Sequence, residues 1–179
     1  MIPREVITRF DSFLAERQLR LDAVVIGGAA LALLGVVARE TRDCDILAPA
    51  LPEELLRAAR EFAENARATG EALRDDWLNN GPSSMARTLP AGWEHRLRPA
   101  FLGKSIVLHT LGRMDLLKTK LVGLCDRGTD LPDCMALAPS SEEIDEAMEW
   151  VKQQDGNPDW PAYVEQVLND LRRRLGHGI

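Results

Sequence analysis

Residues 24–47 read VVIGGAALALLGVVARETRDCDIL, and this stretch decides the fold that we predict. The short, apolar and β-branched run at residues 21–26 predicts a buried strand that ends at Gly27. Alanine and leucine dominate residues 29–38 and predict a helix, and CDILA at residues 44–48 predicts a second strand. Strands that alternate with helices in this way are typical of an α/β core.

Further elements flank this core on both sides. Apolar residues at helical intervals predict an amphipathic helix over residues 4–19, and first-turn glutamates begin another helix at Pro52 that ends near Gly70. The middle of the chain, residues 71–100, is rich in turn-forming residues and predicts only one or two short strands. Residues 104–111, KSIVLHTL, predict a clearer strand.

The rest of the chain is predicted to be helical. The expected helices cover residues 114–127, residues 130–138, residues 139–154 and a last segment from about Pro158. Ser140 and Glu143 have the spacing of a capping box at the start of the third of these helices. Because no linker divides the chain, we expect one domain over residues 1–179, with an α/β core to about residue 111 and a helical part from about residue 112.

Two aspartates flank a single cysteine at the head of the second predicted strand. Side chains alternate between the two faces of a strand, so Asp43 and Asp45 are expected to point the same way, with Cα atoms about 7 Å apart. Two carboxylates on one face suit Mg²⁺, which prefers a few carboxylates together with water and phosphate oxygens. The pair therefore predicts a metal site for a phosphoryl-type displacement.

Two glycines stand where the first predicted strand ends. Without Cβ atoms, Gly27 and Gly28 let a phosphate approach the backbone closely, and the helix that follows presents free N–H groups to it. The glycines are therefore predicted to hold a triphosphate beside the metal. The alternative is structural, with a tight turn at the glycines and the aspartates at a solvated strand end.

Composition narrows the classes of protein that fit. The formal charge of −6 over 179 residues disfavours a surface built to neutralise nucleic-acid phosphates. The three cysteines are odd in number and lack a C-x-x-C pair, and the three histidines are isolated, so neither a disulfide framework nor a zinc site is expected. With no leader peptide and no long apolar run, we expect a cytoplasmic protein without a membrane partner.

The order of strand, Gly-Gly, helix and D-x-D strand resembles the nucleotidyltransferase superfamily. The stretch is similar in particular to the bacterial branch of AbiEii-type toxins and uncharacterised nucleotidyltransferase-like proteins, which also favours Arg-x-Thr before the acidic pair, here Arg39 and Thr41. The resemblance implies a small mixed sheet flanked by helices and a helical C-terminal half. It also implies nucleotide binding, Mg²⁺ as cofactor and an NTP such as ATP as co-substrate.

A second block, DLLKTKLVGLCDRGTDLPDC, is similar to that branch as well. The resemblance assigns Lys120 to catalysis or nucleotide binding and matches Arg127, Asp130 and Asp133 to the arginine and acidic pair that follow. Independently, Lys120 lies on a ridge of leucines, where its ammonium needs an anion or else reaches past the apolar face to water. The same two interpretations apply to Lys118, which is the second candidate after Lys120 for binding an anion.

A third carboxylate, general in this superfamily, has no clear position. The strand at residues 104–111 contains no acid, and His109, Asp75, Asp76 and Glu94 are only weak alternatives.

Without a clear third carboxylate, two hypotheses about function remain open. One is an enzyme that transfers a nucleoside monophosphate to a hydroxyl on RNA, on a protein or on a small molecule, including a toxin with a cognate antitoxin. The other is an inactive protein of the same fold that binds a nucleotide or a protein partner.

Overall fold

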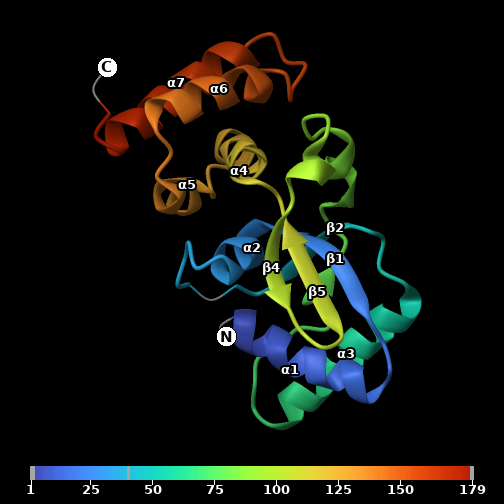
Figure 1. Cartoon of the computed structure of the whole chain (residues 1–179). Helices are drawn as coiled ribbons and strands as arrows, with labels where there is room; N and C mark the ends of the chain where they lie inside the picture. The colour runs from blue at the N-terminus through green and yellow to red at the C-terminus, as the bar shows by residue number, and fades with distance from the viewer. Residues whose placement is uncertain (1–2, 40, 178–179) are drawn as a thin grey trace. The chain divides into compact units, whose positions relative to one another are not determined.

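The chain divides into two compact units. The structure is a computed structural model that describes residues 3–39 and 41–177 (Figure 1). The first unit, Met1–Leu111, is α/β, and the second, Gly112–Ile179, is helical. The division falls where the sequence predicts the change from α/β core to helical part. That the two units form a single domain stays a prediction.

The first unit is built on a mixed sheet. Among the described residues, its five strands are β1 (Leu21–Ile26), β2 (Cys44–Ala48), β3 (Leu78–Asn79), β4 (Arg98–Leu102) and β5 (Ile106–Thr110), in the order β3-β2-β1-β5-β4. Strand β1 is antiparallel to β2 and parallel to β5, β2 is parallel to β3, and β4 is antiparallel to β5. The helices are α1 (Pro3–Glu16), α2 (Gly27–Leu33) and α3 (Glu53–Ala68), with short 3₁₀ helices at Ser83–Arg87 and Trp93–Arg96. The predicted small mixed sheet flanked by helices is confirmed.

An aromatic cluster lies at the centre of the core between α1, α3 and the sheet. The Phe10 ring of α1 lies 5.2 Å from the Phe62 ring of α3 and 5.1 Å from the Trp77 ring, centroid to centroid. The Trp77 indole N–H donates to the carbonyl of Ala59 at 3.0 Å. Because Trp77 directly precedes β3, these contacts fix the segment that leads into the edge of the sheet.

Two predicted boundaries in the first unit are wrong. The helix predicted over residues 29–38 is α2, which begins at Gly27 and ends at Leu33. It stops because Gly35 has a φ of +73° and the Val36 N–H bonds back to the helix, as at many helix ends. The strand predicted over residues 104–111 is β5, shortened because the chain turns between β4 and β5.

The second unit contains four described helices. They are α4 (Arg113–Arg127), α5 (Leu131–Leu137), α6 (Ser141–Lys152) and α7 (Trp160–Arg174). The capping box is present, since the Glu143 N–H donates to Ser140 Oγ at 3.2 Å and the Ser140 N–H donates to Glu143 Oε2 at 3.0 Å. The predicted helical C-terminal half is confirmed.

A buried carboxylate of α1 holds the turn between β4 and β5. Asp11, 6% exposed, accepts backbone hydrogen bonds from Lys104 at 3.0 Å, Ser105 at 2.8 Å and Ile106 at 2.7 Å. Burial by itself raises the pKa of Asp11, but the three hydrogen bonds outweigh it and leave the pKa below its ordinary value of 3.8. Asp11 therefore ties α1 to the turn that joins β4 and β5.

We expect Asp11→Asn to lower the free energy of unfolding by about 2–3 kcal/mol, because an amide nitrogen would face backbone donors. Urea unfolding measures this, with the exposed Asp22→Asn as control, expected to change it by less than about 0.5 kcal/mol. The stability that Asp11 contributes is present above the unfolded pKa and is lost as the pH falls through the lowered folded pKa. A difference from wild type that stayed constant down to pH 2 would contradict this role.

Candidate functional site

The turn after β1 brings a glycine against an acidic side chain. Gly27 has a φ of +73°, and a Cβ placed on it would lie 3.0 Å from Asp45 Oδ2. Ile26, the last residue of β1, pairs with Asp45 on β2, which explains the proximity. Any other residue at position 27 would be strained and would press on this carboxylate.

The second glycine is covered by the segment that returns toward β2. A Cβ on Gly28 would lie 2.9 Å from Thr41 Cγ2 and 3.5 Å from a guanidinium nitrogen of Arg39. The Thr41 hydroxyl donates to the Asp43 carbonyl at 3.4 Å. Arg39 and Thr41, both implied by the resemblance, thus lie at the glycine turn together with Asp45.

The sequence predicts that Asp43 and Asp45 lie in one strand, but the structure places only Asp45 in a strand. Strand β2 begins at Cys44, so Asp43 precedes it and only Asp45 lies within it. The reason is the register: Cys44 pairs with Leu78 at the start of β3, and Asp43 has no strand partner among the described residues.

The two aspartates differ in their surroundings. Asp45 Oδ1 accepts a hydrogen bond from the Asn79 amide at 3.2 Å. Asp43 has a side chain that is 40% exposed, yet its Oδ1 is buried and accepts no hydrogen bond from the described residues. The guanidinium of Arg74 lies 3.9 Å from that oxygen.

The unsatisfied oxygen of Asp43 fits the role of a magnesium ligand. A buried carboxylate oxygen without a hydrogen bond is costly, and a cation would satisfy it. Asp45 Oδ2 lies against the space left by the missing Gly27 side chain. Among the residues that the structure describes, no three His, Cys, Asp or Glu side chains lie together as a metal site. Mg²⁺ would therefore take its other oxygens from water and phosphate, as it usually does.

Two weak alternatives for a third carboxylate are paired with arginines, and Asp76 shares its arginine, Arg74, with Asp43. Asp75 pairs with Arg67 at 2.6 Å and Asp76 with Arg74 at 2.6 Å. His109 of β5 lies 3.9 Å from Asp22 rather than beside the acidic pair. Within the described part of the chain, the acidic pair thus has no third acid.

Sequence reasoning missed two residues of this site. Asn79 holds Asp45, and Arg74 lies beside Asp43. The asparagines of WLNNGPSS were a signal, but the two-residue strand β3 that places Asn79 opposite Asp45 leaves no periodic pattern in the sequence.

Lys120 of the second unit is a buried, paired cation. It lies on α4 with 7% exposure, and its Nζ contacts Asp130 Oδ1 at 2.9 Å and Asp133 Oδ2 at 2.7 Å. Burial lowers the pKa of the Lys120 ammonium, but the hydrogen bonds to Asp133 and Asp130 outweigh it and raise the pKa above its ordinary value. Lys120 is therefore protonated at neutral pH and ties α4 to the start of α5.

Other charges complete this cluster. Arg127 Nη2 contacts Asp130 Oδ2 at 3.1 Å, so two cations face two carboxylates. Lys118, the second-ranked lysine, lies 3.8 Å from Glu146. Since the Lys120 ammonium already has two anionic partners, its role in phosphate binding, like those of Arg127 and Asp133, stays a prediction.

Comparison with known proteins identifies one related family. Residues 5–138, well over half of the chain, match the sequence model of a family described as "Nucleotidyltransferase of unknown function (DUF6036)". No curated protein and no solved structure matches the chain significantly. In the described part of the chain, none of the helices has the length and apolar character that a membrane span requires.

We expect Lys120→Ala to lower the free energy of unfolding by about 3–5 kcal/mol, because the buried carboxylate of Asp133, 1% exposed, would lose the ammonium that contacts it at 2.7 Å. The matched control is Lys152→Ala, which also removes a lysine with two carboxylate partners, Glu149 and Glu165, but exposed ones. Its expected loss is about 1 kcal/mol or less. Chemical denaturation measures both.

Adding Asp133→Asn to Lys120→Ala should recover part of the loss, because the buried negative charge that lost its ammonium is removed. If the double variant were no more stable than Lys120→Ala, the pairing would not be the reason for the loss.

Proposed function

The chain belongs to this family of nucleotidyltransferases of unknown function, and from that premise we propose that it moves a nucleoside monophosphate from an NTP to a hydroxyl acceptor with Mg²⁺. The observation that carries the proposal is the convergence of the Gly27-Gly28 turn with Asp45. A phosphate site and a metal site must adjoin in such a reaction, and the proximity of the glycine turn to Asp45 supports such an arrangement.

The glycine turn is the proposed phosphate-binding element. At the start of α2, the first backbone N–H groups have no partner within the helix, and the half-buried glycines there carry no side chain that would compete for the space beside them. Arg39, whose guanidinium lies beside Gly28, would add a positive charge to the same place.

Asp43 and Asp45 are the proposed metal ligands. Asn79 would act indirectly, since its hydrogen bond to Oδ1 orients the Asp45 carboxylate. When bound, Mg²⁺ supplies the positive charge that offsets charge developing on the phosphate oxygens. The acceptor oxygen forms a bond to the α-phosphorus, the bond to the bridging oxygen breaks, and pyrophosphate leaves while the hydroxyl proton passes to water.

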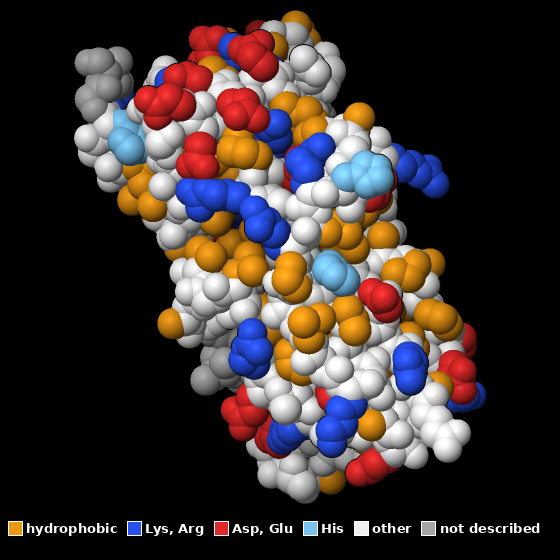
Figure 2. All heavy atoms as spheres, viewed as in Figure 1, with side chains coloured by type: hydrophobic (Ala, Val, Ile, Leu, Met, Phe, Trp, Pro, Cys, Tyr) orange, Lys and Arg blue, Asp and Glu red, His pale blue; other side chains and the backbone are white. Residues whose placement is uncertain are grey.

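The proposed reaction needs a hydroxyl acceptor, which three classes of molecule can provide. RNA, a protein or a small molecule each offers the required hydroxyl, and a toxin with a cognate antitoxin fits this chemistry. The surface gives a long polyanion little support: Figure 2 shows acidic side chains gathered over α6 and α7 on the face in view. The exposed acids of α6 are Glu142, Asp145, Glu146 and Glu149.

A second candidate function is nucleotide binding without turnover. It is favoured by the absence, among the described residues, of a third acid beside the pair. The superfamily uses that acid to activate the hydroxyl, so a site with two carboxylates would bind Mg²⁺ and NTP but transfer slowly.

Asp43→Asn and Asp45→Asn should each remain folded and lose Mg²⁺-dependent NTP binding, with affinity lowered at least about tenfold, because a ligand charge is removed. Titration calorimetry with each NTP, with and without Mg²⁺, measures this. Asp22→Asn, an exposed aspartate of β1, is the control and should bind as wild type does. Unchanged affinity in both site variants would remove the metal site from the proposal.

Incubation with NTPs labelled on the α-phosphate and with cell extract should move label to RNA, to protein or to a small molecule. Transfer that is lost in Asp45→Asn supports the enzyme and reveals the acceptor. Mg²⁺-dependent binding without transfer would instead favour the second candidate.

A further inference from the structure

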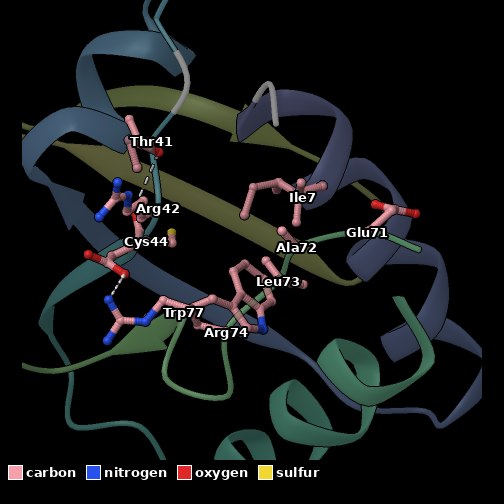
Figure 3. Close-up of a pocket in the computed structure, with 12 residues that line it drawn as sticks. Ile7, Thr41, Arg42, Cys44, Glu71, Ala72, Leu73, Arg74 and Trp77 are labelled. Atoms are coloured by element: carbon pink, nitrogen blue, oxygen red, sulfur yellow. Dashed lines mark hydrogen bonds and ion pairs between the residues drawn. The ribbon is translucent and has the colours of Figure 1, made fainter. Parts of the chain in front are cut away.

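A pocket in the first unit borders the glycine turn through Thr41 and the proposed metal site through Asp43. It has a volume of about 650 Å³, within the range of about 300–1,000 Å³ that small-molecule sites occupy. Its apolar wall comes from α1, α2 and the segment before β3, with Ile7, Leu73 and Trp77 as the large side chains (Figure 3). Neither glycine of the turn lines it, nor does Asp45.

The apolar wall is held in place before any ligand binds. Trp77 is fixed by the hydrogen bond from its indole to Ala59 and by its edge contact with Phe10. The Cys44 N–H donates to the Trp77 carbonyl at 2.5 Å, which joins this wall to the start of β2. A preformed wall lowers the entropic cost of binding an apolar group.

The charged residues of the pocket are distributed unevenly. Figure 3 shows Arg42 and Arg74 at one end and Glu71 at the other. Glu71 is held by two hydrogen bonds from Arg9, at 2.5 and 2.6 Å. The hydrogen bond from Arg9 lowers the pKa of Glu71. Glu71 therefore stays negatively charged, and the guanidinium of Arg9 balances this charge.

At the opposite end, one cation has no counterpart. Arg74 is bound by Asp76 at 2.8 and 2.6 Å and lies near Asp43. Arg42 is exposed and forms no hydrogen bond or ion pair with the described residues. An apolar pocket with one unmatched guanidinium at its end is complementary to an apolar group that carries one negative charge.

We propose that this pocket binds a small amphipathic carboxylate, with its apolar body against Ile7, Leu73 and Trp77 and its carboxylate at Arg42. A single charge fits better than a phosphate dianion, because Asp43 and Asp76 stand at the same end. The pocket borders the proposed nucleotide site through Thr41 and Asp43, but the binding proposed here needs neither Mg²⁺ nor nucleotide.

Octanoate, 1-octanol and octylamine test the proposal, since they share one tail and differ in head group. Titration calorimetry on the full chain, without nucleotide, should give one-to-one binding of octanoate, with 1-octanol about tenfold weaker and octylamine weaker still. Equal affinity for the three head groups, or no saturable octanoate binding, overturns the proposal.

Two variants locate the site. Arg42→Gln removes the charge from an exposed side chain and should weaken octanoate about tenfold while leaving 1-octanol unchanged. Ala72→Trp, at an exposed position beside Leu73, fills the pocket and should abolish binding of both. The matched control is Arg57→Gln on the exposed side of α3, which should bind as wild type does. Octanoate binding that survives Ala72→Trp lies elsewhere and overturns the assignment.

Discussion

The candidate site depends on the absence of a side chain at Gly27. The left-handed backbone there lets the chain pass from β1 into α2 within one residue, and the space that a Cβ would fill lies 3.0 Å from an oxygen of Asp45. The direction of α2 and the position of the carboxylate are thus set by the same residue. Gly28 also has to lack a side chain, because a Cβ there would lie 2.9 Å from Thr41 Cγ2, in the segment that leads from α2 to β2.

How much of this could be predicted depends on how local each signal is. The glycine turn, the capping box at Ser140 and the strand runs were readable because the contacts that produce them lie within a few residues. The bounds of β2 agree with the predicted strand CDILA, but Asp43 precedes it, because a strand begins where its neighbours offer partners and the neighbour here is a strand of two residues. Asn79 was missed for the same reason.

Lys120 shows a different limit. The periodicity of α4 correctly placed an ammonium on an apolar face, and such a charge requires an anion. The sequence could not say whether the anion is a phosphate or a carboxylate of the protein itself. Asp130 and Asp133, which look like ordinary residues at a helix start, supply it from the next helix of the same unit. A cation on an apolar face therefore predicts a partner but not its identity.

Residues 41–45 illustrate how one short segment can serve two sites. Thr41 and Asp45 contact the glycine turn, and the apolar pocket is lined by Thr41 again, with Arg42, Asp43 and the buried Cys44. Arg42 and Asp43 are neighbours of opposite charge that do not pair with each other in the described structure. The backbone bends at Arg42, and the guanidinium that lies near Asp43 is that of Arg74, at 3.9 Å. The same geometry that leaves one oxygen of Asp43 for a cation leaves the guanidinium of Arg42 for an anion.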